Sequence, residues 1–156
     1  MDRISLFIRE NIRLLLGAAV VIFVIVLLLT LVLARKTTKV TMGNHTFSVS
    51  VAKTEKAKQI GLSERKSLAK NDGMLFLFDQ PDYYAFWMKN MDFPIDIVYM
   101  NDNKVVYIVK DAKPVPSGNL PIFQPNQKAN EVLEINAGLS NQYNIKQGTS
   151  VKVENL

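Results

Sequence analysis

Three stretches of the sequence place charged residues among apolar ones. Lys89 and Asp96 lie in the runs FWMKN and FPIDI, and Glu134 interrupts the apolar alternation of VLEIN. Arg65 ends the run GLSER, a few residues before the apolar segment Met74–Phe78. Because a buried charge normally needs a partner, these residues are the first candidates for a site.

We expect a shared polar pocket beside the single tryptophan, built from Arg65, Trp87, Lys89, Asn90, Asp96 and Glu134. An aromatic ring with a few fixed charges suits a small polar ligand such as a sugar or a carboxylate. An alternative needs only ordinary packing physics. These residues would then pair with each other, or with loop backbone, and hold the long Pro-rich segment 111–129 in place.

An enzymatic alternative uses Asp96 and Glu134 as a carboxylate pair, one protonated and one ionised. A hydrolase acting on envelope glycans would need the two carboxyl groups about 5–9.5 Å apart. The sequence does not supply that distance, so Asp96 and Glu134 are only candidates and no catalytic residue is assigned. The absence of cysteine excludes disulfides and thiolate chemistry, and a lone His45 argues against a histidine metal site. We expect no metal and no cofactor.

A long apolar segment precedes these motifs. From Leu14 to Leu33 the sequence carries no charge, and a helix of that length would span about 30 Å, the thickness of bilayer hydrocarbon. A cleaved signal peptide is the alternative, but its apolar region is usually shorter, about 7–15 residues. We therefore expect residues 1–36 to be a tail and an uncleaved single-pass anchor in the cell membrane, with 37–156 as the folded domain.

Charge gives a weaker indication of orientation and partners. Basic residues flank both ends of the apolar segment, so the positive-inside rule only slightly favours a cytoplasmic N-terminus and an extracytoplasmic domain. Most of the net charge of +5 falls within residues 1–36, which leaves the domain nearly balanced. A nucleic-acid partner is therefore not expected. The expected partners are the membrane and a small polar ligand or envelope component.

The sequence of the domain predicts an all-β fold. Lys39–Met42 and Thr46–Val51 flank Gly43-Asn44, which predicts a hairpin, and Thr54 and Gly61 predict the two ends of a short helix. We further expect a helical turn within Leu62–Lys70 and a helical turn within Ala137–Tyr143. Short strands are expected over the following ranges: Met74–Phe78, Tyr83–Met88, Ile95–Met100, Lys104–Val109, Glu131–Ile135 and Gly148–Val153. Such a pattern favours a sandwich or a barrel.

These motifs, in this order, resemble an uncharacterised prokaryotic family known as domain of unknown function 192. The matching runs are Gly61-Leu62 with Arg65, Gly73–Phe76, Phe86–Asn90, Pro94–Ile97, Val132–Gly138 and Gly148. The resemblance covers roughly residues 40–154. It implies a compact all-β domain, similar to a jelly-roll-like sandwich with small helices packed beside it, in proteins that are often exported or membrane-tethered. It implies no established activity. The sequence thus predicts a membrane-anchored accessory or ligand-binding module, with a protein-interaction module as another alternative.

Overall fold

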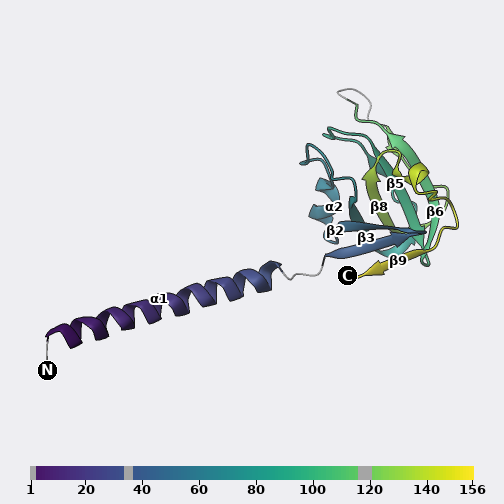
Figure 1. Ribbon diagram of the computed structural model, residues 1–156. Coiled ribbons are helices and arrows are strands. Elements are labelled where there is room, and N and C mark those ends of the chain that lie inside the picture. Colours follow the sequence, from purple (N-terminus) through teal and green to yellow (C-terminus); the bar gives the residue numbers. More distant parts are fainter. Residues whose placement is uncertain (1–2, 34–36, 116–120) are drawn as a thin grey trace. The chain divides into compact units, whose positions relative to one another are not determined.

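The computed structural model describes residues 3–33, 37–115 and 121–156. The chain divides into two compact units, Met1–Lys36 and Thr37–Leu156. In the first unit, helix α1 runs from Arg3 to Leu33 (Figure 1). Among the described residues, no helix combines the length and the apolar character needed to cross a membrane. Part of the predicted span, including Leu31–Leu33, lies outside the residues whose side chains are described.

The second unit begins with the predicted hairpin and short helix. Strands β1 (Thr38–Met42) and β2 (His45–Ala52) pair antiparallel, and Met42 faces His45 across the two-residue turn. Helix α2 (Glu55–Ile60) starts where the Thr54 side chain accepts a hydrogen bond from the Ala57 N–H. It ends at Gly61, whose φ of 54° suits glycine. Both local predictions are confirmed.

A single seven-stranded sheet forms the body of this unit. The remaining long strands are β3 (Asp72–Asp82), β5 (Ile95–Asn101), β6 (Lys104–Ala112), β8 (Ala129–Asn136) and β9 (Val151–Glu154). Their order is β6-β5-β8-β3-β2-β1-β9. The β2–β3 pair is parallel, since the chain crosses over through α2, and the other pairs are antiparallel.

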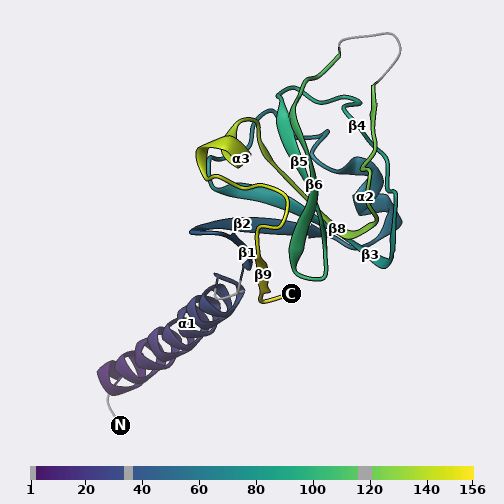
Figure 2. The same cartoon turned by 90° about the vertical axis from the view of Figure 1, so that its right-hand side faces the viewer.

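The sheet curls until its two edges meet at one end (Figure 2). Val105 donates to the Thr149 carbonyl and accepts from the Gly148 N–H, while Val151 donates to the Asn103 carbonyl. These bonds join the start of β6 to the segment before β9. The prediction of a mostly β fold with small helices is confirmed. The architecture is one curled, half-barrel sheet, whereas a jelly-roll-like sandwich would need two sheets packed face to face.

The two faces of the sheet carry separate apolar clusters. The barrel cluster takes one residue or more from every strand of the sheet, including Val40, Leu75 and Val151, so it fills the inside of the curl. The outer cluster lies on the opposite face and includes Phe76, Ile97, Tyr99 and Val132. Because both faces are buried, any polar side chain on the central strands must be accommodated inside an apolar layer.

The cover of the outer cluster consists of short pieces. Ala57 of α2, Leu62 and Leu68 pack against it, as do Phe86 of β4 (Phe86–Trp87) and Phe123 of β7 (Ile122–Phe123). Strands β4 and β7 form a separate two-stranded ribbon. Tyr99 of β5 donates a hydrogen bond of 3.1 Å to the Phe123 carbonyl and so ties this ribbon to the sheet.

Three local predictions are wrong or only partly covered by the described residues. The strand expected over Tyr83–Met88 is reduced to the two residues of β4, because these aromatic side chains cover the sheet instead of extending it. Leu62–Lys70 forms turns and irregular backbone, and only Leu62 and Leu68 are buried there. The Pro-rich segment contains β7, while 116–120 lies outside the described residues. The helical turn near the C-terminus is confirmed as α3 (Leu139–Gln142).

Candidate functional site

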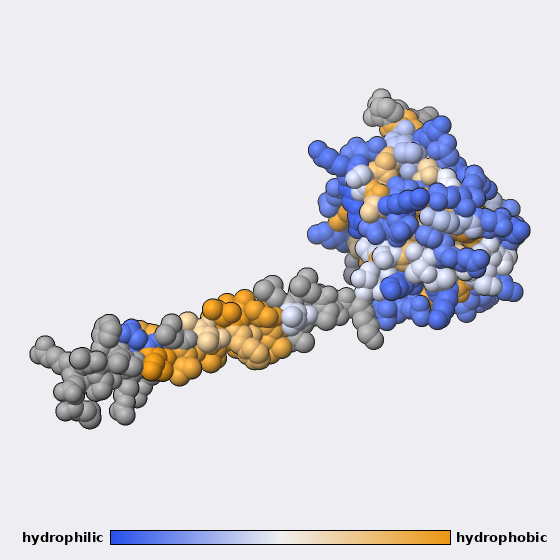
Figure 3. Space-filling view, in the orientation of Figure 1, coloured by the Kyte–Doolittle hydropathy of each residue, from blue (hydrophilic) through white to orange (hydrophobic). Residues whose placement is uncertain are grey.

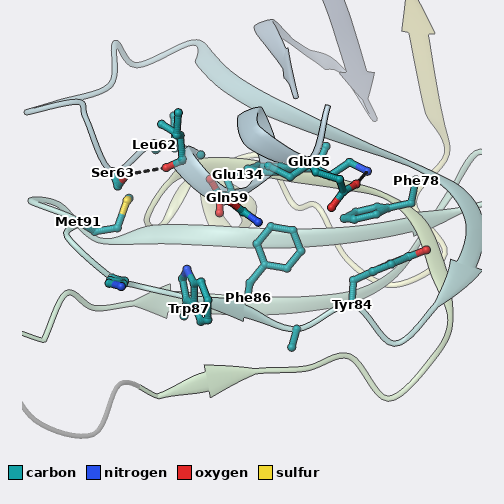
Figure 4. A pocket seen from close by; sticks show the side chains of 16 residues that line it. Glu55, Gln59, Leu62, Ser63, Phe78, Tyr84, Phe86, Trp87, Met91 and Glu134 are labelled. Carbon is teal, nitrogen blue, oxygen red and sulfur yellow. Dashed lines mark hydrogen bonds and ion pairs between the residues drawn. The ribbon is translucent and has the colours of Figure 1, made fainter. Parts of the chain in front are cut away.

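A cavity of about 190 Å³ lies on the outer face of the sheet, between α2 and β4 (Figure 4). Its floor comes from β3 and β8, one wall from α2 and the turn after it, and the other wall from the segment around β4. The lining residues are Glu55, Lys58, Gln59, Ile60, Gly61, Leu62, Ser63, Phe76, Phe78, Tyr84, Ala85, Phe86, Trp87, Lys89, Met91 and Glu134. A second hollow of about 390 Å³ shares Trp87 and Lys89 with this cavity and adds Asn90.

Glu134 supplies the acidic group of the floor. It lies on β8, paired between Met74 of β3 and Ile97 of β5, and only 5% of the residue is exposed. Within the described part of the chain its buried Oε2 atom has no hydrogen-bond partner. Burial raises the pKa of Glu134 to about 8, because the ionised carboxylate loses its hydration there. The carboxyl group is therefore protonated in most molecules at neutral pH.

Aromatic rings make up much of the remaining lining. Phe86 meets Phe76 edge-on at 5.0 Å between ring centroids, and Phe78 stacks on Tyr84 at 3.6 Å. Figure 4 shows Phe86 between the Phe78–Tyr84 stack on one side and Trp87 on the other. Trp87 remains 54% exposed, so its ring forms a wall near solvent and not part of the core. This combination gives the cavity an apolar interior with a single buried acid.

The two lysines of the lining differ in exposure, since 15% of the Lys58 side chain is exposed whereas Lys89 is an exposed residue. Lys58 forms an ion pair of 2.9 Å with Glu55, and its Nζ atom sits 4.5 Å from the centroid of the Phe78 ring. Lys89 is exposed, and among the described residues it has no ion pair. Tyr99, on the strand next to Glu134, has its pKa raised well above the ordinary value by burial and then by the nearby Glu134 charge. It stays neutral across the physiological range.

Local backbone chemistry sets the positions of the walls. The turn after α2 is fixed by Gly61 and by the Ser63 hydroxyl, which donates to the Ile60 carbonyl at 2.6 Å. After β4 the chain turns through Asn90, whose φ of 56° is a conformation that asparagine tolerates better than most residues. On the floor, a Cβ added at Gly73 would come within 2.9 Å of the Glu134 carbonyl oxygen. Glycine is therefore required where β3 passes β8.

Four of the six predicted site residues lie around this cavity. Glu134, Trp87 and Lys89 line it directly, and Asn90 lines the adjoining hollow. Arg65 and Asp96 do not line either space.

Arg65 acts elsewhere as a tether. Its guanidinium donates a hydrogen bond of 2.8 Å to the Ser50 hydroxyl, and Ser50 in turn donates to the Gly73 carbonyl at 3.4 Å. These contacts tie the irregular segment after α2 to strands β2 and β3. Arg65 therefore holds the segment after α2 against the sheet, whereas the structural alternative expected it to hold the Pro-rich segment 111–129.

Asp96 is also structural, and it faces the other side of the sheet. It is fully buried, and its carboxylate accepts from the Asp111 N–H at 2.9 Å and from the N–H and hydroxyl of Ser140 at 2.9 and 2.7 Å. In the β5–β8 register Asp96 pairs with Ile135, so its side chain shares the face of the barrel cluster. Glu134 points to the opposite face. The carboxylate pair required by the hydrolase alternative is not formed.

Apart from Trp87, the aromatic residues of the lining are not among those we predicted for the site. Phe76, Phe78 and Phe86 look like ordinary core residues in the sequence, and Tyr84 belongs to the run expected as a strand. Gln59 and Ser63 lie close to the C-terminal end of α2, and nothing in the sequence around them indicates a binding site. The usable clue was the pairing of aromatic residues with charges in FWMKN.

Comparison with known proteins gives the family. The profile of the family DUF192, described as Uncharacterized ACR, matches residues 37–153. The chain belongs to this family. The match includes every lining residue of the cavity. A comparison with curated proteins finds no match.

Two solved structures are similar to this member of the family. One is a protein of unknown function from Novosphingobium aromaticivorans, 33% identical, with a TM-score of 0.68 over 73% of this chain and 83% of that chain. The other is described as a putative transcription regulator from Sinorhizobium meliloti, 25% identical, with a TM-score of 0.70 over 78% of this chain and 97% of that chain. The likeness supports the fold of the domain.

The first prediction concerns Asp96. An Asp96→Asn variant keeps the shape but replaces one acceptor oxygen by a donor, so at least one of the three N–H or O–H groups loses its buried acceptor. We expect the free energy of unfolding to fall by about 1–3 kcal/mol, measured by urea denaturation. The matched substitution Asp102→Asn, in an exposed turn, should change it by no more than about 0.5 kcal/mol. Equal, small effects would contradict the structural role.

The second prediction concerns the pH dependence of stability. The folded pKa of Glu134 lies above its unfolded value, so between about pH 4.5 and pH 8 the folded state holds a proton that the unfolded state has lost. This group therefore lowers stability as pH rises, by at most about 1.4 kcal/mol per pH unit, and its effect levels off above pH 8. Glu134→Gln should remove that part of the slope in urea titrations at several pH values. Parallel slopes for the two proteins would refute the assignment.

Proposed function

We propose that the domain is a binding module for a small organic ligand, and that Glu134 and Trp87 contact this ligand. The observation that carries the proposal is the Oε2 atom of Glu134, which is buried at the floor of a cavity with aromatic walls and has no partner among the residues that the structure describes. Leaving a buried polar atom unpaired costs about 1–3 kcal/mol. A ligand that hydrogen-bonds to this atom would recover that cost on binding.

The size and lining of the cavity support a small ligand. A volume of about 190 Å³ suits a single ring or a short chain more than a polymer segment. The rings of Phe86 and Trp87 offer flat apolar surface, and Gln59 and Ser63 add polar atoms to the wall. Ligand sites commonly combine such an apolar lining with a few polar groups that fix orientation.

We further propose that residues 1–36 hold the domain at the cell membrane, with the domain on the extracytoplasmic side. The support comes from the uncharged sequence Leu14–Leu33 and from the exposure of apolar side chains along α1. Leu14 and Phe23 are 69% and 66% exposed, and Figure 3 shows a band of apolar side chains on the visible face of this helix. Apolar surface of this extent in a folded unit usually has a partner, and lipid is the partner that the length favours.

A protein-interaction module is the second candidate function, and one observation favours it. Trp87 and Ile122 pair across the β4–β7 ribbon and are 54% and 68% exposed. Exposed aromatic and aliphatic side chains that lie together are typical of binding surfaces. Co-purification from detergent extracts distinguishes the candidates, because a protein partner would be lost on Ile122→Ser while small-ligand binding would persist.

The third prediction tests the ligand-binding role. The full chain in detergent micelles is titrated with a library of sugars, organic acids and amines, and its single Trp reports on the cavity. We expect at least one class to change Trp87 fluorescence and to raise the melting temperature. Glu134→Gln should weaken that binding at least tenfold, about 1.4 kcal/mol.

Glu131→Gln is the matched control for that titration. Glu131 lies on the same strand but does not line the cavity, so its substitution should leave binding unchanged. The proposal fails if the whole library leaves both the fluorescence and the melting temperature unchanged.

The fourth prediction tests the anchor and its orientation. The full chain should stay with membranes after alkaline carbonate extraction, and a chain of residues 37–156 made in the cytoplasm should be released. Protease added to cells with a permeabilised outer layer should digest the full-length domain, while a cytoplasmic marker protein stays intact. Extraction of the full chain by carbonate would contradict the anchor, and a protected domain would reverse the orientation.

A further inference from the structure

Glu134 is the buried charged residue of the cavity lining. The other charged residues of the lining are Glu55, Lys58 and Lys89; Glu55 and Lys89 are exposed, whereas only 15% of the Lys58 side chain is exposed. Lys58 is held by Glu55 at 2.9 Å, and Lys89 is exposed. Solvent screens an exposed ammonium far more than a group on the floor. Because Lys58 is already paired with Glu55, the titratable group left for a ligand on the floor of the cavity is the Glu134 carboxyl.

One ring of the aromatic wall already contacts a cation from this chain. The Nζ atom of Lys58 lies 4.5 Å from the centroid of the Phe78 ring, within the range of a cation–π contact. The opposite face of that ring is covered by Tyr84, which stacks on it at 3.6 Å. Phe86 and Trp87 offer further rings in the same cavity. Ring faces attract positive charge, and they repel anions at the same positions.

Granting the ligand-binding role proposed above, we propose that the cavity takes an organic cation, whose ammonium group meets Glu134 and whose apolar body lies against Phe86 and Trp87. An ammonium N–H donates to the Oε2 atom that has no partner among the described residues. The resulting charge-assisted hydrogen bond is stronger than one between neutral groups. An anion in the same position would meet a like charge whenever Glu134 is ionised.

Binding of a cation to Glu134 moves a proton. At neutral pH the carboxyl group is mostly protonated, since its pKa is about 8, and it must lose its proton to solvent to pair with an ammonium ion. Tyr99 on β5 stays neutral here because burial raises its pKa, and the other charged side chains of the lining are Glu55, Lys58 and Lys89. Close to one proton should therefore be released for each ligand bound at pH 7.

The fifth prediction uses three probes of one size and different charge: benzylamine, benzyl alcohol and benzoate. They are titrated into the full chain in detergent micelles, with Trp87 fluorescence and calorimetry as readouts. Benzylamine should bind at least tenfold more tightly than benzyl alcohol, and benzoate should bind most weakly. The affinity for benzylamine should rise close to tenfold from about pH 6 to about pH 7 and level off above about pH 8, while the affinity for benzyl alcohol should show no such rise.

Two variants and the proton count separate the outcomes. Glu134→Gln should bring benzylamine to the affinity of benzyl alcohol and abolish proton release, and Glu131→Gln should preserve both. The proposal of a cationic ligand would be overturned if benzoate bound most tightly. It would also be overturned if the affinity for benzylamine fell as the pH rose from about 6 to about 8. If only uncharged or anionic compounds bind, and do so through Glu134, the cation is wrong and the binding role stands. If no probe and no library compound binds, both proposals fail.

Discussion

Neighbouring positions on a β-strand face opposite sides of the sheet, and here both sides are buried. The barrel cluster fills the inside of the curl and the outer cluster lies beneath α2 and β4. A polar side chain on β5 or β8 therefore has no route to bulk water except through a gap in one of these layers. Asp96 and Glu134 lie on adjacent strands, and both side chains are buried in an apolar layer. Their surroundings accommodate the two carboxyl groups in different ways.

Asp96 is matched to its surroundings by donors from two distant parts of the chain. Two backbone N–H groups and the Ser140 hydroxyl saturate its carboxylate, and this fixes the start of α3 and the end of β6 against the sheet. A ligand would therefore find no unsatisfied acceptor on this carboxylate to bind. The residues that pair with Glu134 on the two neighbouring strands, Met74 and Ile97, are apolar. They cannot compensate the charge of an ionised carboxylate. This lack of polar partners, in contrast to Asp96, explains why the pKa of Glu134 is raised and why its Oε2 atom has no partner among the described residues.

Local sequence signals predicted the local structure well. The Gly43-Asn44 turn, the Thr54 cap and the strands around β5 and β6 depend on residues close together in the chain, and they form as expected. The relation of Asp96 to Glu134 depends on strand register instead, because a shift of one residue would bring both carboxylates to one face. Composition carries no information on register between β5 and β8. The aromatic walls were missed for a related reason: Phe86 and Tyr84 belong to a covering layer, and short apolar runs read equally well as strand or cover.

The floor and the walls of the cavity differ in how firmly they are held. Glu134 lies on the central strand β8, which is paired on both sides, whereas α2 has six residues and β4 and β7 have two each. Helices and ribbons this short are not stable alone, so they depend on their caps and on a few side chains such as Ala57 and Phe86 packed on the sheet. Elements of that kind open locally at lower free-energy cost than the sheet does. The cavity thus combines an acidic group on a firmly paired strand with walls built from short elements, whose local opening would leave the barrel cluster intact.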